Sequence, residues 1–392
     1  MADYRQYQHD LLETAGQASY REFPLGEKTA RAFLACPRHL FIKRTRLFGQ
    51  WVNIDPAHSD EYLEFLYRDV PLALMEDREG NILSTISQPS FVLYMLDLLQ
   101  PKEGHAVFEL GTGSGWNAAL LSSMVGEKGH VYSAEIIPEV ARTAQENIRK
   151  LQINNVTVIE GDFDTGLPKE ILFDRVIFTA GGSDLPHFLF NQVVSNGIIL
   201  FPFKVKGGGD ILYLLQKQRD HFESAYTIDC AFVPVTGKYH RVNTDPVLMQ
   251  QIPEWERVKN QMISQSPLWE WGVPTSGGFA NKSHPFRFFL SISEPDYFAL
   301  QKDENDDVIS AFGLWDRESL AICKDDKLFA YGNDRAKERF LNRLRQCAAM
   351  GMPGSAEYRL AVYPVAAEIT AKDNQWLQKR NEAQFLWTVA GK

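Results

Sequence analysis

The sequence predicts an α/β protein with a doubly wound, Rossmann-like sheet, a helical region before it and a smaller α+β domain after it. Three observations support this fold class. Residues 81–237 alternate short β-branched runs with amphipathic helical segments, the pattern of parallel strands joined by helical crossovers. A glycine-rich turn, Gly111–Gly115, follows the first of these strands. The chain also has 392 residues, which is more than one compact domain usually needs.

The elements up to residue 237 follow from these hydrophobic runs. Residues 1–80 have Phe, Leu and Tyr at mixed spacing and are expected to be mostly helical. Strands are expected at Ala106–Leu110, Val131–Ile136, Val156–Glu160, Arg175–Thr179 and Ile198–Pro202, with an added antiparallel hairpin at Ile211–Gln216 and Tyr226–Val233. Helices are expected at Phe91–Leu99, Trp116–Val125, Pro138–Leu151 and Pro186–Val194. Pro138 suits a first helical turn, where its missing N–H costs nothing.

The remaining residues divide into two parts. Residues 238–280 are rich in Pro, Gly, Ser and Trp, which predicts a connector. Residues 281–392 are expected to form a small α+β unit that ends in a strand at Gln384–Val389. The expected organisation is therefore a helical region at 1–80, a ligand-binding α/β domain at 81–237, a connector and a C-terminal domain.

The composition narrows the choice of partners. A formal net charge of −9 disfavours nucleic acid, because phosphate contacts require a basic surface. The densest basic stretch, Arg335–Arg345, has the near-helical spacing of a solvated helix face. No run approaches about 18 uninterrupted apolar residues, so no membrane span is expected. The first residues lack an apolar signal core, and a cytoplasmic location is expected.

The cysteines and histidines predict no metal site. Cysteine occurs at four widely separated positions with no C-x-x-C pair, which excludes a typical zinc site or disulfide framework. Reduced, buried thiols are expected instead. The nine histidines do not cluster at ligand spacing either. The four cysteines are Cys36, Cys230, Cys323 and Cys347.

The strongest chemical signal is the segment Val107–Trp116, in which a buried strand leads into a glycine-rich turn and then a helix. Glycines let the backbone approach a nucleotide-like ligand closely. The spacing G-x-G-x-G, rather than G-x-G-x-x-G, favours an adenosylmethionine loop over a dinucleotide loop. A tight turn without a ligand is the alternative. The candidate cofactor residues here are Glu109, Gly111, Thr112, Gly113, Ser114 and Gly115.

Acidic residues end the next two strands. Glu135 lies twenty residues after Gly115, where a carboxylate can accept hydrogen bonds from both hydroxyls of a ribose. Asp162 follows Gly161 and could accept a hydrogen bond from an adenine amino group, with Gly161 leaving room for the ring. An exposed strand-end acid and an ordinary turn Asp are the alternatives. The acids point to one crevice at the carboxyl edge of the sheet.

A second signal lies just before the central unit, in Leu83–Ser90. Four hydroxyls and an amide precede a helix, so this segment could offer donors and helix N-terminal N–H groups to an anion. Simple helix capping is the alternative, and without other observations it would be preferred.

Together these segments resemble the protein-L-isoaspartate O-methyltransferase family over about residues 25–237. The resemblance implies a class I methyltransferase fold and S-adenosyl-L-methionine as cofactor. It also implies a peptide or protein acceptor that bears isoaspartate or aspartate. The segments that carry it are Cys36–Phe41, Thr85–Pro89, Phe108–Ala119, Val131–Glu139, Asn155–Asp162, Asp174–Ala180 and Ala231–Gly237.

The resemblance assigns roles to individual residues. Ser87 would orient the acceptor carboxylate, with Thr85 and Gln88 shaping the site. Ile136 and Thr179 would join the cofactor residues. The substrate-binding residues would be Ile86, Pro89, Ala180, Phe232, Val233 and Pro234. Departures from the family pattern, which would alter the acceptor pocket, are Trp116 in place of tyrosine, Phe163 in place of a small residue, and Gly181-Gly182-Ser183 in place of an alanine-rich loop.

Three segments stand out in the C-terminal extension: Leu328–Gly332, Ala349–Pro353, and Lys379-Arg380 before the strand at Phe385–Trp387. With them the extension resembles that of methyltransferases that modify aspartates in ribosomally made peptides, such as lanthipeptides and graspetides. It is expected to select the substrate, while the methyl-transfer site lies before residue 237. Its aromatic residues either fill its own core or contact the acceptor, and its basic helix either is a solvated helix face or contributes to substrate selection. The aromatic residues in question are Phe288, Phe289, Trp315, Trp376 and Trp387.

The sequence thus predicts carboxyl O-methylation, which forms a methyl ester that can collapse to a succinimide. Two rival functions remain. The first, a nucleic-acid methyltransferase on the same scaffold, is weakened by the net acidity and by the absence of an Asn/Asp-Pro-Pro-Tyr/Phe motif. The second is a module that binds adenosylmethionine without catalysis. Repair of damaged proteins, modification of a dedicated precursor peptide and the oligomeric state are not distinguished at this level.

Overall fold

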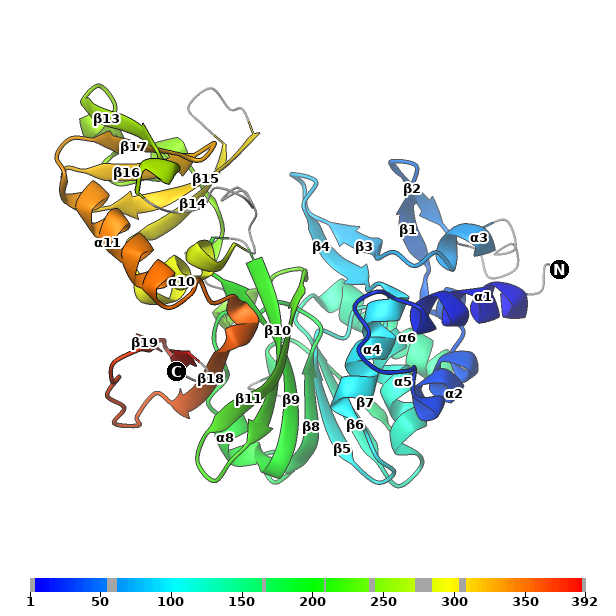
Figure 1. Cartoon of the computed structure of the whole chain (residues 1–392). Coiled ribbons are helices and arrows are strands. Elements are labelled where there is room, and N and C mark those ends of the chain that lie inside the picture. The colour runs from blue at the N-terminus through cyan, green and yellow to red at the C-terminus, as the bar shows by residue number, and fades with distance from the viewer. Residues whose placement is uncertain are drawn as a thin grey trace.

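A ten-stranded sheet forms the centre of the computed structural model, which describes residues 4–54, 62–163, 167–207, 209–239, 244–271, 284–302 and 308–389 (Figure 1). The strand order is β19-β20-β18-β11-β10-β9-β8-β5-β6-β7. The five strands from β5 to β9 pair in parallel, and the strands from β10 onward pair antiparallel. The parallel strands are β5 (Ala106–Leu110), β6 (His130–Glu135), β7 (Val156–Glu160), β8 (Phe173–Phe178) and β9 (Val193–Val205).

The predicted doubly wound α/β fold is confirmed, and its helices lie close to the expected positions. They are α4 (Pro89–Leu99), α5 (Trp116–Val125) and α6 (Pro138–Lys150). Side chains of successive strand residues point to opposite faces of the sheet. Val107 therefore packs with α4 and α5, whereas Phe108 packs on the other face with Phe163 and Phe173.

Two expected elements near the end of this unit differ from those observed. The helix expected at Pro186–Val194 is only α8 (Leu189–Gln192), because the β-branched Val193 already pairs with Phe173 as the first residue of β9. The hairpin is formed by β10 (Gly209–Lys217) and β11 (Phe222–Cys230). Its second strand starts and ends earlier than expected, and residues 231–233 leave the sheet.

The prediction that residues 1–80 are mostly helical is wrong, because part of this region forms strands. Four short strands form two hairpins, and β1 shows the alternating exposed and buried positions of a strand. The helices are α1 (Tyr4–Gly16), α2 (Glu27–Ala35), the 3₁₀ helix η1 (Arg38–Phe41) and α3 (Leu63–Leu66). The strands are β1 (Arg44–Leu47), β2 (Gln50–Asn53), β3 (Leu72–Glu76) and β4 (Ile82–Ile86).

The C-terminal region contains a second sheet, with strand order β12-β14-β15-β16-β17-β13. The two edge strands of this sheet, β12 and β13, fall in the expected connector, 238–280, which is therefore not an irregular linker. Residues 240–243 and 272–280 of the connector lie outside the described part of the chain. Helices α10 (Pro285–Ser293) and α11 (Arg335–Ala349) accompany this sheet. Its strands are β12 (Val247–Leu248), β13 (Met262–Pro267), β14 (Tyr297–Lys302), β15 (Val308–Trp315), β16 (Leu320–Lys324) and β17 (Lys327–Tyr331).

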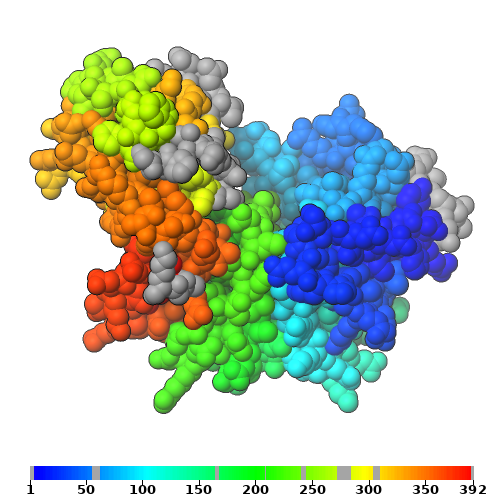
Figure 2. Space-filling model, in the orientation of Figure 1, coloured from blue at the N-terminus to red at the C-terminus, as the bar shows by residue number. Residues whose placement is uncertain are grey.

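The last three strands return to the central sheet, where β18 pairs with β11. They are β18 (Tyr358–Pro364), β19 (Gln375–Lys379) and β20 (Ala383–Val389), and β20 contains the strand expected at Gln384–Val389. In the space-filling view the N-terminal residues (blue) and the C-terminal residues (red) lie at opposite ends of the molecule, with the residues around 200 (green) between them (Figure 2).

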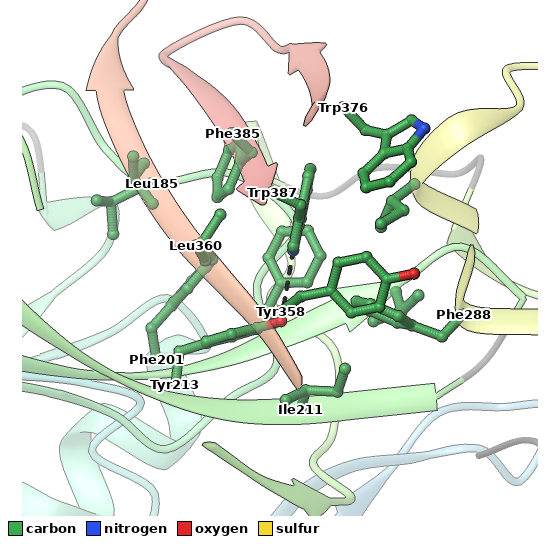
Figure 3. Close-up of a cluster of buried hydrophobic side chains, with 14 of the residues drawn as sticks. Leu185, Phe201, Ile211, Tyr213, Phe288, Tyr358, Leu360, Trp376, Phe385 and Trp387 are labelled. Carbon is green, nitrogen blue, oxygen red and sulfur yellow. Dashed lines mark hydrogen bonds between the residues drawn. The ribbon is translucent and has the colours of Figure 1, made fainter. Parts of the chain in front are cut away.

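One hydrophobic core joins the central sheet to the extension (Figure 3). Phe201 and Tyr213 of the central strands share this core with Phe288 of α10, Tyr358 of β18 and Trp387 of β20. The indole Nε1 of Trp387 donates a hydrogen bond to the hydroxyl of Tyr213, at 3.4 Å. Because the extension covers this face of the central sheet, a chain that ended near residue 237 would expose it to water.

No helix in the described ranges combines the length and apolar character needed to cross a bilayer. The four cysteines are free thiols, of which three are buried and Cys230 is half-buried. Among the described residues, no group of three or more His, Cys, Asp or Glu side chains is arranged to hold a metal ion.

Candidate functional site

A cavity lies at the carboxyl edge of the parallel strands, and most of the predicted site residues line it. Fifteen of the predicted residues form its wall, and the remaining five, Gln88, Pro89, Glu109, Gly115 and Phe232, do not. Those that line it are Thr85, Ile86, Ser87, Gly111, Thr112, Gly113, Ser114, Glu135, Ile136, Gly161, Asp162, Thr179, Ala180, Val233 and Pro234.

The glycine loop packs too tightly for side chains at two positions. Gly111 has φ +99° and Gly113 has φ +53°, in the left-handed region that favours glycine. A Cβ at Gly111 would lie 2.6 Å from the hydroxyl of Thr179, and one at Gly113 would lie 3.2 Å from the carbonyl oxygen of Thr85. The loop therefore runs between the end of β8 and residues Leu83–Ser90, which we call the hydroxyl segment. The backbone of the loop forms part of the cavity wall.

Glu135 stands at the end of β6 with a buried carboxylate. Its Oε2 accepts from the backbone N–H of Gly113 at 3.0 Å, and its Oε1 accepts from that of Ile137 at 3.1 Å. Burial raises the pKa of Glu135, and the backbone N–H groups oppose this shift. A carboxylate offers about four acceptor positions. The two remaining positions suit the two hydroxyls of a ribose, so this residue fits the predicted cofactor.

Glu109 was predicted to contact the cofactor, but it lies behind the loop and does not line the cavity. It is fully buried, with Oε1 accepting from Asn117 Nδ2 at 2.7 Å and Oε2 accepting from Ser133 Oγ at 2.5 Å. Burial raises its pKa to about 7, and the hydrogen bonds from Ser133 and Asn117 oppose the shift. Its role in the geometry is to join β5 to α5 and β6, which supports the loop between them.

The far end of the cavity is closed by two aromatic rings. Phe163 follows Asp162 and stacks on Tyr239, with ring centroids 4.9 Å apart and an interplanar angle of 23°. Both rings line the cavity beside Gly161. Sequence reasoning noted Phe163 only as a departure and missed Tyr239, which lies beyond the expected end of the domain. Tyr239 belongs to no motif. Its position, as an aromatic residue just after the Phe232–Gly237 segment, could nevertheless have indicated that it lies near the cavity.

The hydroxyl segment forms the opposite wall. Thr85 and Ile86 end β4, and Ser87 follows them, so all three line the cavity before α4 begins. Gln88 is the N-cap residue of α4 but makes no side-chain cap. Its amide instead donates to Asp69 Oδ2 at 2.9 Å, away from the cavity. The capping alternative therefore does not account for the side chains of Thr85 and Ser87.

The loops that follow β8 and β11 form a third wall of the cavity, and hydrogen bonds join the two loops. The N–H of Gly181 donates to the carbonyl oxygen of Val233 at 2.8 Å, and the N–H of Val235 donates to that of Gly181 at 2.9 Å. Val233 and Pro234 thus line the cavity. Phe232 does not, because its ring packs near Phe91, with centroids 6.0 Å apart.

The candidate substrate contacts of the extension are mostly structural. Phe288, Phe289, Trp376 and Trp387 are buried in the shared core, and Trp315 is half-buried. In α11, Arg339 and Arg343 both pair with the buried carboxylate of Glu294. The basic helix therefore uses two of its arginines within the domain.

Comparison with known proteins shows to which family the chain belongs. Residues 27–240 match the model of a family described as protein-L-isoaspartate(D-aspartate) O-methyltransferase. A protein-L-isoaspartate O-methyltransferase of Ignicoccus hospitalis is 33% identical over 209 residues, which are 53% of this chain and 89% of the relative. One of Pyrococcus horikoshii is 34% identical over 214 residues, 54% of this chain and 86% of the relative.

A solved structure named protein-L-isoaspartate O-methyltransferase shares the fold of the extension as well. It is 21% identical, with a TM-score of 0.55, and the superposition covers 90% of this chain and 96% of the other. Since the family match ends at residue 240, coverage of this extent includes much of the C-terminal region. From the family match over more than half of its length, the chain belongs to the protein-L-isoaspartate O-methyltransferase family.

Proposed function

We propose that the protein is an S-adenosylmethionine-dependent carboxyl O-methyltransferase that acts on L-isoaspartyl or aspartyl residues of proteins or peptides. The observation that carries the proposal is that one cavity is lined both by the glycine loop with Glu135 and by Thr85 and Ser87. Gly111, Gly113, Glu135 and Asp162 would hold the cofactor. Ser87 would hold the acceptor.

The nature of the cavity wall supports a carboxylate acceptor. Among the described residues that line it there is no Lys, Arg, His or Cys. Its two acids, Glu135 and Asp162, lie on the cofactor side at the ends of β6 and β7. An amine or alcohol acceptor has to lose a proton, which calls for a base. A carboxylate with a pKa near 4 is already ionised at neutral pH and needs none.

The residues then have to align the acceptor and remove water from it. Bound adenosylmethionine supplies a methyl group whose bond to the sulfonium sulfur breaks as a bond to the carboxylate oxygen forms. The Ser87 and Thr85 hydroxyls donate to the carboxylate without holding it as strongly as an arginine would. Trp116, Phe163 and Tyr239 exclude water from the cavity. Positioning of this kind can supply roughly 7–11 kcal/mol in favourable cases.

The chemical stability of the product tests the reaction type. Purified protein would be incubated with adenosylmethionine labelled in the methyl group and with two peptides that differ only in an isoaspartyl or an aspartyl residue. We expect label in at least one peptide, released as methanol by mild alkali, because esters hydrolyse readily. Alkali-stable label in a peptide or a nucleic acid would overturn carboxyl methylation. Adenosylmethionine binding without transfer to any acceptor would favour the non-catalytic alternative.

A second cavity suggests how the C-terminal region would select the substrate. It measures about 460 Å³ and lies between the central sheet and the extension. Ala231 and Phe232 line it, and the next two residues, Val233 and Pro234, line the methyl-transfer cavity. Ser355 lines it from the extension. We propose that a peptide whose acceptor residue occupies the first cavity extends its neighbouring residues into the second.

Filling the second cavity tests this proposal without truncating the shared core. Ala231→Trp and Ser355→Trp place a bulky ring on either side of it. We expect a roughly tenfold loss of kcat/KM for a long peptide acceptor and less than a threefold loss for a tripeptide, as expected when binding away from the reacting group is removed. Ser123→Trp, at an exposed position of α5, is the control. Equal losses for both acceptors would mean that the extension is only structural.

A further inference from the structure

Arg38 lies in the first turn of η1, and its side chain is completely buried. Its guanidinium donates to three carbonyl oxygens in residues 66–70, at 2.8–3.2 Å. The same group donates to the carbonyl oxygens of Ile86 and Ser87, at 3.3 and 3.1 Å. Burial lowers its pKa to about 9, with Asp69 opposing the shift, so it remains charged at neutral pH.

Asp69 holds the other side of the same segment. Its Oδ1 accepts from the backbone N–H of Ser90 at 2.8 Å. Its Oδ2 accepts from Ser90 Oγ at 2.6 Å and from Gln88 Nε2 at 2.9 Å. The first turn of α4 is therefore capped by a residue twenty-one positions earlier in the chain, not by a local side chain. Neither Arg38 nor Asp69 lines the methyl-transfer cavity.

We propose that Arg38 and Asp69 are positioning residues that hold the hydroxyl of Ser87 in its place in the acceptor site, an inference that rests on the proposed function. Arg38 binds the carbonyl group of Ser87, and Asp69 fixes the helix turn that follows it. Ser87, which lies between these two anchored points, lines the cavity. The segment at residues 66–70 is the common support, since Arg38 binds its carbonyl groups and Asp69 belongs to it.

The choice of residue types agrees with this role. A planar guanidinium has five N–H donors in a fixed fork, so it can bind carbonyl groups from several segments at once. A lysine ammonium has three donors at one point and cannot reach all of them. The ring of Trp116, which lines the cavity, lies 5.7 Å from the Arg38 guanidinium carbon, so the same cation also packs against the cavity wall.

The experiment compares Arg38→Lys with Arg175→Lys in the full chain. Arg175 is also a buried arginine that binds backbone carbonyl groups, of Leu99 and Asp174, but it lies away from the cavity. Both variants should lower the melting temperature. Only Arg38→Lys should reduce kcat/KM for the isoaspartyl peptide, by roughly 10- to 100-fold as a small misplacement does. Adenosylmethionine affinity, measured by calorimetry, should change less than threefold.

Hydrogen exchange gives a readout that does not depend on the acceptor. Amides in residues 84–90 should exchange faster in Arg38→Lys than in wild type or Arg175→Lys, while those in α6 should not. Unchanged exchange there, or equal catalytic losses in the two arginine variants, would overturn the positioning role. A wild-type protein that transfers no methyl group to any carboxylate would overturn the proposed function instead.

Asp69→Asn provides a second variant if Arg38→Lys does not fold. Asp69 is only half-buried, and Asn keeps its shape while losing acceptors for Ser90 Oγ or Gln88 Nε2. We expect the same pattern at smaller size: a lower kcat/KM for the acceptor, faster exchange at residues 84–90 and unchanged cofactor affinity. Wild-type values for all three would contradict the proposal.

Discussion

The part of the cavity proposed to bind the cofactor (the cofactor half) and the part proposed to bind the acceptor (the acceptor half) are held by different kinds of contact. In the cofactor half, Glu135 binds the N–H groups of Gly113 and Ile137, so residues at the ends of neighbouring strands fix one another. In the acceptor half, Ser87 depends on Arg38, which is forty-nine residues away in the sequence. The contacts that hold the cofactor half lie within its own sequence motifs. The contacts that hold the acceptor half come from residues outside its motif.

The other acceptor wall shows the same dependence. The Val233–Pro234 wall is preceded by Phe232, whose N–H donates to Asp210 Oδ2 at 2.9 Å. Asp210 is buried and paired with Lys204 Nζ at 3.0 Å. Burial raises the pKa of Asp210, and Lys204 opposes the shift. Substitutions far from the acceptor can therefore disturb it, whereas the cofactor half is sensitive mainly to changes within its own loops.

The largest expected effect is on cofactor binding by Glu135→Ala. Two hydrogen bonds from ribose to a carboxylate, at roughly 1.5–3 kcal/mol each, predict that Kd for adenosylmethionine rises by about 100-fold or more. Calorimetry measures it. Glu160→Ala is the matched control, because Glu160 also ends a strand but is exposed and lies outside the cavity. Equal affinities in Glu135→Ala and wild type would remove Glu135 from the cofactor site.

The next effect concerns the support behind the cofactor loop. Because the pKa of folded Glu109 is raised from 4.5 to about 7, the folded protein keeps a proton that the unfolded chain has lost between these values. Stability should fall as the pH rises through this window. Glu109→Gln removes the titration. The free energy of unfolding of the variant relative to that of wild type, measured with urea, should therefore rise by on the order of 3 kcal/mol between pH 5 and pH 8. A constant difference would refute the raised pKa.

Ser87→Ala tests the acceptor half directly. A hydroxyl-to-carboxylate hydrogen bond is worth roughly 1.5–3 kcal/mol, so kcat/KM for the acceptor should fall by about 10- to 100-fold. Adenosylmethionine binding should remain unchanged, which separates this variant from Glu135→Ala. Ser123→Ala, on an exposed face of α5, should behave as wild type. Unchanged methylation in Ser87→Ala would move the acceptor site elsewhere.

The smallest catalytic effect is expected in the extension. Arg343→Gln breaks one ion pair with Glu294, while Arg339 keeps the other. The melting temperature should fall, because a buried carboxylate loses a partner. The ratio of kcat/KM for long and short acceptors should change less than twofold. A larger change in that ratio would assign the basic helix to substrate recognition after all.

The sequence predicted the cofactor half well because its chemistry is local. The spacing of Gly111, Gly113 and Glu135 follows from a strand, a turn and the next strand, so their meeting at one edge could be inferred from periodicity. Glu109 has the same local setting but lies behind the loop, because its side chain at the end of β5 is directed to Asn117 and Ser133. Strand position alone does not reveal that direction.

The rest depended on contacts between distant segments. The roles of Arg38, Asp69 and Tyr239 arise only when the N-terminal region and the segment after Gly237 fold against the central sheet. Short strands such as Arg44–Leu47 were missed because four residues give little periodic signal, and they are paired only in the tertiary structure. The alternating runs of the extension did not show that β18–β20 would join the central sheet.

The return of β18–β20 to the central sheet has a consequence for how the protein is made. The N–H of Leu360 donates to the hydroxyl of Ser224 across a separation of 136 residues. During synthesis, β10 and β11 therefore emerge long before β18, which pairs with the other edge of β11, and the extension does not yet cover the apolar side chains of Phe201 and Tyr213. Long-range pairing of this kind slows folding and favours aggregation of the incomplete chain. Cells producing the protein should thus depend on chaperones during the interval in which the second sheet is being translated.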